Sequence, residues 1–271
     1  MTEELAKPQL HASDLRTLSM CPMRYFYRRV EGIIAPPGVA LVVGSTVHRS
    51  VEHDMRTKLE EKKLADAEVL TDLAVEALKE KFKEGVALDE DEKKVGEKAT
   101  RAEAEKKVVR LSLLHHDEAA PGIEPLYVER KWVIKMKGYP MDLAGQIDVQ
   151  ELDLSVDDAK TAGRTPPKTA ADTSQQLTMY ALATKVTDGK LPPKVRLHNL
   201  VDLKKPKLVT YESTRDEEDV TILLRRVQAA VQLIEKGVWF PCDPGDWCCS
   251  PRWCGYWDRC PYSKKPVSVA T

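Results

Sequence analysis

The sequence predicts an α/β fold in which a central mixed sheet is flanked by helices. Three observations predict it: the first 125 residues read mainly as helices, residues from Leu126 onward alternate apolar and polar side chains, and a helical segment separates two groups of strands. A chain of 271 residues can bury one large core or two small ones. We therefore expect a mainly helical region over 1–125, an α/β core over 126–238 and a cysteine-rich tail over 239–271.

The N-terminal region is expected to hold about four helices. Ser13 can cap a first helix that reaches Phe26, although Pro22 should disturb its middle. A Pro-Pro-Gly turn follows, and a second helix is expected to start near Ser45. The stretch 66–117 is rich in Ala, Glu, Lys and Leu, which predicts two more helices with a break at about 84–91 and a charged, solvated surface.

Five strands and two helices are expected in the rest of the chain. Alternating apolar and polar residues place the strands at 126–136, 139–150, 154–162, 195–203 and 207–213. Thr173 or Ser174 can cap a helix over 174–186, between the third and fourth strands. A last helix is expected from Asp216 to Lys236, ahead of the cysteine-rich tail.

Composition restricts the functional classes. Lys and Arg number 42 against 43 Asp and Glu, so the net charge of −1 requires any polyanionic ligand to bind a local basic patch. No window approaches roughly eighteen apolar residues, and the N-terminus lacks the apolar core of a signal peptide. We therefore expect an intracellular, cytoplasmic protein with no membrane association. In a reducing compartment, clustered cysteines are more often metal ligands than disulfides.

Chemically capable side chains gather on two neighbouring predicted strands. Asp158 and Lys160 are two residues apart and project from one face of the third strand, whereas Asp157 points the other way. If the second and third strands pair through the short turn, Asp148 comes close to Asp158. Two carboxylates can hold Mg²⁺ or Mn²⁺ for phosphodiester hydrolysis, and Lys160 can orient the attacking water. The alternative is an ordinary ion pair at a strand end.

Several short segments carry a resemblance to a known family. The motifs GQID, then DAK ten residues later, then QLTMY on the following helix resemble those of the PD-(D/E)XK nuclease superfamily, in its RecB-like branch with the Q-x-x-x-Y motif. This branch includes CRISPR-associated RecB-like exonucleases and the nuclease domains of AddAB-type recombination machines. SMCPMRYFY resembles the family's first cysteine segment, and GSTVHRSVE the helix that brings a histidine to the metal. The resemblance implies a restriction-endonuclease-like core over 126–238.

The resemblance also implies roles for particular residues. They are Asp148, Asp158, His48 and the backbone carbonyl of Ala159 as ligands of Mg²⁺ or Mn²⁺, Lys160 as the catalytic lysine, and Gln176 and Tyr180 as residues that position DNA or the active site. Gln176 and Tyr180 are four apart and so share one helical face. Without the resemblance, His48 would be interpreted as a surface residue and Tyr180 as a core aromatic. Glu129 is a weaker candidate to orient a ligand or a second ion.

The cysteine-rich tail is expected to hold a metal. Cys249, Cys254 and Cys260 have C-x4-C and C-x5-C spacings, and the family's terminal cysteines commonly end with the C-x5-C step. The resemblance implies a [4Fe–4S] cluster on Cys21, Cys249, Cys254 and Cys260, with Cys248 as the alternative to Cys249. A structural Zn²⁺ on Cys242, Cys248 or Cys249, Cys254 and Cys260 is the rival. The interleaved aromatic residues are expected to pack around the site, with base stacking as the alternative.

The expected function is metal-dependent hydrolysis of DNA, with an exonuclease or end-processing enzyme on single-stranded DNA favoured. Local basic residues could contact phosphates: Arg24, Arg28, Arg164 and Lys168. A catalytically silent, metal-stapled DNA-binding or assembly subunit is the alternative from another class. An iron–sulfur electron carrier is disfavoured, because no segment resembles a flavin or nucleotide site. A role in DNA repair or recombination, with a helicase, recombinase or CRISPR-adaptation partner, is implied by family analogy alone.

Overall fold

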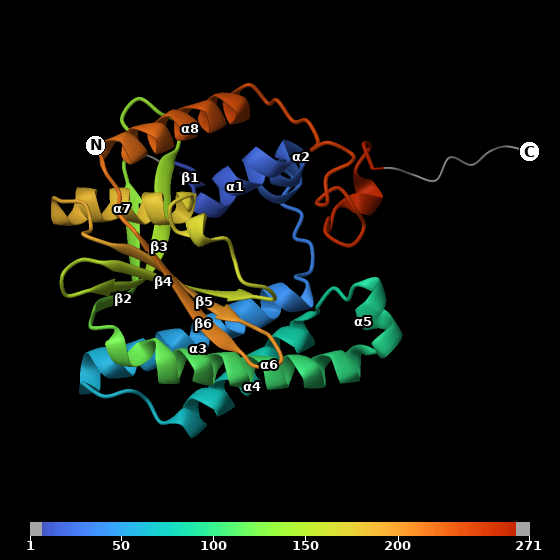
Figure 1. Cartoon of the computed structure of the whole chain (residues 1–271). Coiled ribbons are helices and arrows are strands. Elements are labelled where there is room, and N and C mark those ends of the chain that lie inside the picture. The colour runs from blue at the N-terminus through green and yellow to red at the C-terminus, as the bar shows by residue number, and fades with distance from the viewer. Residues whose placement is uncertain (1–6, 264–271) are drawn as a thin grey trace, which may run out of the picture.

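The computed structural model describes residues 7–263 and has a mixed sheet between two layers of helices (Figure 1). The outermost residues of the predicted helical region and tail, 1–6 and 264–271, lie outside the described part. The strands are β1 (Gln9–Leu10), β2 (Pro125–Ile134), β3 (Asp142–Glu151), β4 (Val156–Ala162), β5 (Val195–Val201) and β6 (Lys207–Ser213). Their order is β1-β3-β4-β5-β6, with β2 also paired to β3.

The sheet mixes antiparallel and parallel pairs. β2 with β3, β3 with β4, and β5 with β6 are antiparallel, whereas β1 with β3 and β4 with β5 are parallel. Parallel neighbours need a crossover connection, and helix α7 (Gln175–Asp188) supplies it between β4 and β5. This sheet, flanked by helices on both faces, confirms the predicted mixed α/β, restriction-endonuclease-like fold.

Two apolar cores hold the helices against the sheet. The helices are α1 (Ala12–Met20), α2 (Pro22–Tyr25), α3 (Val39–Glu61), α4 (Ala67–Glu84), α5 (Glu90–Val95), α6 (Glu97–Glu118), α7 and α8 (Glu217–Glu235). Residues of α1, α7 and α8 share one core, and those of α3, α4 and α6 share the other, on the opposite side of the sheet in Figure 1. Among residues 7–263, no helix is long and apolar enough to cross a membrane.

The strands and the last two helices lie close to the ranges predicted from the sequence, but the N-terminal region differs. The first helix ends at Met20, and Pro22 starts a separate short helix that continues as a π-helical turn, Phe26–Val30. Helix α3 begins at Val39 rather than near Ser45, because Val42 and Val43 are buried in the core. The stretch 66–117 holds three helices instead of two, and strand β1 was not predicted.

Gly145 on β3 lets a tryptophan pack across the hairpin that carries Asp148. A Cβ at Gly145 would lie 2.5 Å from a ring atom of the buried Trp132, its partner on β2. We expect Gly145→Ala to lower the free energy of unfolding by about 1–3 kcal/mol through overpacking. Chemical denaturation of this variant beside Gly122→Ala, whose Cβ would meet no atom within 4 Å, checks it. Equal stability of the two variants would contradict this packing.

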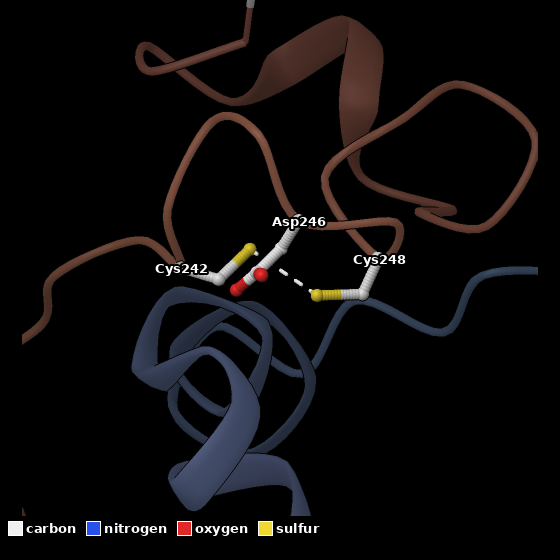
Figure 2. Close-up of side chains that lie close together, drawn as sticks. All are labelled: Cys242, Asp246 and Cys248. Atoms are coloured by element: carbon white, nitrogen blue, oxygen red, sulfur yellow. Dashed lines mark hydrogen bonds between the residues drawn. The ribbon is translucent and has the colours of Figure 1, made fainter.

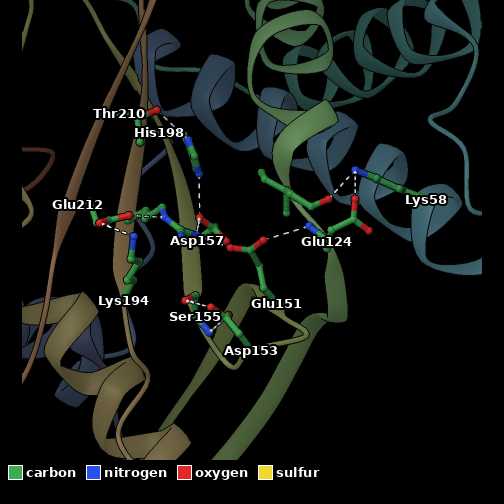
Figure 3. A network of polar contacts seen from close by, with 12 residues as sticks. Lys58, Glu124, Glu151, Asp153, Ser155, Asp157, Lys194, His198, Thr210 and Glu212 are labelled. Atoms are coloured by element: carbon green, nitrogen blue, oxygen red, sulfur yellow. Dashed lines mark hydrogen bonds and ion pairs between the residues drawn. The ribbon is translucent and has the colours of Figure 1, made fainter.

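The β4 side chain next to the predicted catalytic aspartate belongs to a separate polar network on the other face of the sheet. Asp157 accepts from His198 Nε2 at 2.9 Å and pairs with Arg196 at 3.3 Å (Figure 3). Arg196 also bonds Glu212 and Glu151. As predicted from strand alternation, Asp157 therefore points away from Asp158 and Lys160, which contact each other. Asp157 thus links β4 to the neighbouring strand β5 through Arg196 and His198.

His115 on α6 packs beside this network and links stability to pH. Its ring lies 6.3 Å from that of His198, and burial lowers the pKa of His115 to about 3. Below its ordinary pKa of about 6.5, the unfolded chain takes up a proton that the folded protein does not, so stability falls as pH decreases. Between pH 7 and pH 5 we expect this group to cost about 2 kcal/mol.

The variant His115→Leu isolates this effect, because it removes the proton-binding group from a buried site. Urea denaturation at pH 7 and pH 5 should show a loss of stability that is about 2 kcal/mol smaller in the variant than in the wild type. The same loss in both proteins would show that His115 is not buried in its neutral form.

Candidate active site

The hairpin formed by β3 and β4 brings the two predicted catalytic aspartates together. Val149 pairs with Asp157 and Gln150 with Val156. The same register, continued by one step, places Asp148 opposite Asp158. Both carboxylates are buried, Asp158 completely. The condition set by the sequence, pairing of these strands through a short turn, is therefore met.

Lys160 shares a strand face with Asp158 and contacts it directly. Its Nζ lies 2.8 Å from each Asp158 carboxylate oxygen and has hydrogen-bond geometry only toward Oδ1. Burial, and next the charge of Asp148, raise the pKa of Asp158 to about 7. Burial alone would lower the pKa of Lys160, but the charges of Asp158 and Asp148 outweigh it and raise that pKa. The Lys160 ammonium therefore stays protonated. A buried carboxylate thus holds a cationic side chain at the end of β4.

Helix α3 delivers His48 to the same place. Its Nε2 lies 2.6 Å from Asp148 Oδ2. Gly44, one turn earlier, permits this approach, since a Cβ there would lie only 3.2 Å from Thr161 Oγ1 on β4. Although burial disfavours the imidazolium, the hydrogen bond and charge of Asp148 raise the pKa of His48 to about 9. A glycine four residues before His48 therefore lets helix α3 pack close enough to β4 for the histidine to reach Asp148.

Glu129 and Gln146 complete the cluster. Glu129 lies in β2 between the paired residues Val128 and Arg130, and its φ of 55° is unusual for a non-glycine residue. Its Oε1 is 3.6 Å from His48 Nδ1, and its other carboxylate oxygen accepts a hydrogen bond from Gln146. Burial and the charge of Asp148 raise the pKa of Glu129 to about 7. Sequence reasoning missed Gln146, although its position two residues before Asp148 on β3 was a usable signal.

The two residues of the Q-x-x-x-Y motif bond to each other on α7. Gln176 Nε2 donates to Tyr180 Oη at 2.6 Å, and Tyr180 is buried. Burial, with the nearby charges of Asp148 and Asp158, raises the pKa of Tyr180 well above its ordinary value. The phenol therefore stays protonated beside the carboxylate cluster. Helix α7 thus borders the site from the face opposite α3.

The donor set fits a divalent cation. One ligand atom each from His48, Glu129 and Asp148 lie within 4.8 Å of one another, and Asp158 stands beside them. Carboxylate oxygens suit Mg²⁺ and Mn²⁺, and the His48 nitrogen would suit Mn²⁺ in particular once the cation displaces the proton that Asp148 holds on the ring. Burial first, and then the charge of Asp148, raise the pKa values of Asp158 and Glu129, and a bound cation would favour the charged form of both carboxyl groups.

The predicted DNA-contacting residues lie in two places. Arg164 and Lys168 are exposed on the segment that follows β4. Arg28 is exposed on the π-helical turn, and Arg24 is half-buried and lines the cysteine cavity. The exposed Arg16 on α1, which the sequence did not single out, lies close enough to Lys160 to influence its pKa.

Cysteines from both ends of the chain meet in one cavity. All six are free thiols in this structure, and all six line the cavity, which brings Cys21 at the start of α2 together with the five cysteines of the tail. Cys21, Cys242 and Cys248 are buried, and the others are partly exposed. Tyr256 Oη donates to the carbonyl of Ile33 at 3.0 Å, so the tail is bonded to the segment after α2.

This thiol set fits an iron–sulfur cluster, because four thiolates are the usual ligands of [4Fe–4S]. It contains Cys21, the distant ligand that the resemblance requires, and also every cysteine of the local zinc alternative. Cys242 and Cys248 form a close pair inside the cavity, above the N-terminal helices in Figure 2. Six thiols therefore line the cavity, two more than a four-thiolate site would use.

The sheet order and the acidic and lysine residues at the β3–β4 hairpin are those expected of the restriction-endonuclease-like class of folds. The family model described as "PD-(D/E)XK nuclease superfamily" matches residues 9–261, and the chain belongs to that superfamily. A search of curated proteins gave no match.

Several solved structures are similar to this chain, including two crystal structures. One is the crystal structure of a "Putative exonuclease" from Eubacterium rectale, with a TM-score of 0.58 and 15% identity over 99% of this chain and 94% of that chain. The other, a crystal structure of SSO0001, has a TM-score of 0.43 and 13% identity over 97% of this chain and 91% of that chain. The first similarity shows a shared fold along nearly the whole length of both chains.

Proposed function

We propose that the protein is a DNA nuclease that hydrolyses phosphodiester bonds with Mg²⁺ or Mn²⁺. The observation that carries this proposal is the convergence of His48, Asp148 and Asp158 with Lys160 at one end of the β3–β4 hairpin. Strand pairing alone explains the proximity of the aspartates, but it does not explain why a helix delivers a histidine to them. In a member of this superfamily, such a cluster is best interpreted as an active site.

Each side chain of the cluster has a proposed role in cation binding, in hydrolysis or in positioning the DNA. His48, Asp148, Asp158 and the backbone carbonyl of Ala159 would hold the cation, which when bound polarises the scissile phosphate and lowers the pKa of water. Asp158 keeps Lys160 protonated and in place, so the ammonium can orient the attacking water and offset negative charge developing on the phosphate. Gln176 and Tyr180, bonded to each other, would position the DNA backbone or the carboxylates.

We favour exonuclease action on single-stranded DNA. The family resemblance supports exonuclease action, and so does the structural likeness to a protein described as a "Putative exonuclease"; the preference for single strands is our expectation alone. Arg164 and Lys168, exposed just beyond β4, are available to bind the phosphates of a strand entering the site. Linear and circular single-stranded DNA of equal length, incubated with Mn²⁺, test this: only the linear strand should be degraded. Equal cleavage of the circle would show endonuclease action.

We further propose that Cys21, Cys249, Cys254 and Cys260 hold a [4Fe–4S] cluster, as in the RecB-like branch, with Cys248 as the alternative to Cys249. Support comes from the shared cavity, which brings Cys21 to the tail although more than two hundred residues separate it from Cys249 in sequence. Closing so long a loop lowers the entropy of the unfolded chain, so the cluster would act first as a structural clasp. A Zn²⁺ site on the tail cysteines is the rival that metal analysis would reveal.

A further inference from the structure

Two cysteines are left over once the proposed cluster has its ligands. Cys242 and Cys248 lie in the same cavity as the other four, and both are buried. The Cys248 thiol donates to Cys242 Sγ at a sulfur–sulfur distance of 3.4 Å, as Figure 2 shows. With Cys249 rather than Cys248 as the cluster ligand, the pair is in contact without belonging to the ligand set, so this inference rests on that part of the assignment proposed above.

We propose that Cys242 and Cys248 form a redox-responsive dithiol that closes to a disulfide beside the cluster. A disulfide needs a sulfur–sulfur distance of about 2.05 Å, so the two sulfurs must approach by about 1.4 Å. The connecting residues 243–247 are exposed and include Gly245 in a turn, whose backbone N–H bonds the Asp243 side chain. This short surface loop can move by that amount without disturbing the core.

A separate metal site is the competing use of these thiols. Asp246 places a carboxylate oxygen within 4.8 Å of both sulfurs, giving three of the four donors that Zn²⁺ requires. A fourth donor from the protein would be a neighbouring thiol, and those lining the cavity are the proposed cluster ligands, whereas a structural Zn²⁺ site normally has four protein ligands. With three donors available, closure of the sulfur pair is the simpler outcome.

The chemical step balances with a low-molecular-weight disulfide such as oxidised glutathione. The sulfur of one cysteine attacks a glutathione sulfur and forms a mixed disulfide, releasing one glutathione. The second cysteine then attacks the mixed disulfide and releases the other. The protein loses two electrons and two protons, and oxidised glutathione is reduced to two molecules of reduced glutathione.

The position of the pair gives this step a consequence for the cluster. Cys248 is next to Cys249 in sequence, and both line the cavity, so a free Cys248 can compete with Cys249 for iron. Closure with Cys242 removes Cys248 from that competition and ties it to the start of the tail. The disulfide would therefore fix Cys249 as the cluster ligand.

Thiol mapping of the purified iron-loaded protein tests the proposal. The protein is treated with oxidised glutathione, and its remaining free thiols are then alkylated in denaturant. Digestion with Asp-N and trypsin places Cys242 on peptide 237–242 and Cys248 on peptide 246–252. We expect these peptides to be joined, with a mass about 2 Da below the sum of peptide 237–242 and peptide 246–252 carrying one alkyl group. Fragment ions should place that alkyl group on Cys249 and the bond on Cys248. Iron content should stay unchanged.

The variants Cys242→Ser and Cys248→Ser serve as matched controls. Each should abolish the cross-linked peptide and keep the iron content of the wild type. The proposal would be overturned if the peptides of the oxidised wild type stay unlinked or carry glutathione adducts alone. It would also be overturned if the wild type binds one equivalent of zinc that Cys242→Ser loses. Loss of iron in either variant would overturn it too, since that cysteine would then be a cluster ligand. The peptide analysis does not depend on DNA cleavage, so a protein without nuclease activity could still form the Cys242–Cys248 disulfide. The nuclease proposal and the disulfide proposal can therefore fail independently.

Discussion

Asp158→Asn is expected to reduce the rate of DNA hydrolysis by about a thousandfold or more. The substitution removes a negative charge from the centre of the cluster, where Asp158 would bind the cation and hold Lys160. Both consequences act on the transition state, so kcat should fall much more than KM rises. Cleavage of a labelled single strand with Mn²⁺, followed at several DNA concentrations, measures the two parameters.

The thermal stability of Asp158→Asn separates catalysis from folding. Asp158 is completely buried, and burial with the charge of Asp148 raises its pKa. The raised pKa means that burial and Asp148 outweigh the ion pair with Lys160, whose side chain is 41% exposed. An uncharged amide of the same shape should therefore give a Tm equal to or above that of the wild type. Asp153→Asn, on the exposed turn between β3 and β4, is the matched control and should retain full activity. An active Asp158→Asn variant would remove this residue from the mechanism.

Cys21→Ser is expected to remove the iron from the protein. Anaerobically purified wild type should be brown and carry about four irons per chain, and the variant should be colourless with fewer than about one. The serine oxygen is a poor substitute for a thiolate, and no remaining cysteine lies on the N-terminal helices. Iron analysis and the visible spectrum provide the measurement.

The loss of the cluster should also loosen the tail. Without it, contacts such as Tyr256 with Ile33 are left to hold residues 239–263 against the helices, and limited proteolysis should cut the tail faster. Cys242→Ser, from the same cavity, is the control and should keep both colour and resistance. A brown Cys21→Ser protein, or a colourless wild type with one zinc, would contradict the assignment of Cys21 as a ligand.

Local rules made the β3–β4 part of the site predictable. Period-two alternation places Asp158 and Lys160 on one face and Asp157 on the other, and the turn between β3 and β4 limits their register. The helix cap at Ser174 follows from its side chain, which accepts from Leu177 N. Such features depend on residues close together in sequence, so the sequence alone could specify them.

Features that depend on distant partners were not predictable in this way. The early start of α3 depends on burial of Val42 and Val43 against other elements. The sequence predicts a later start, because the Pro-Pro-Gly turn and Gly44 are residues that usually interrupt helices. Short strand β1 exists only because β3 is there to pair with it. The meeting of Cys21 with the tail could be predicted only from the family resemblance, because no local rule links residues so far apart.

The most direct test of the account is whether the purified protein cleaves DNA when a divalent cation is supplied. Labelled linear single-stranded DNA should be degraded in Mn²⁺ or Mg²⁺, and EDTA should stop the reaction because His48, Asp148 and the neighbouring Asp158 would then hold no cation. Lys160→Met should be inactive under the same conditions. Wild-type protein that binds the strand but leaves it intact with both metals would contradict the account and identify a silent DNA-binding subunit instead.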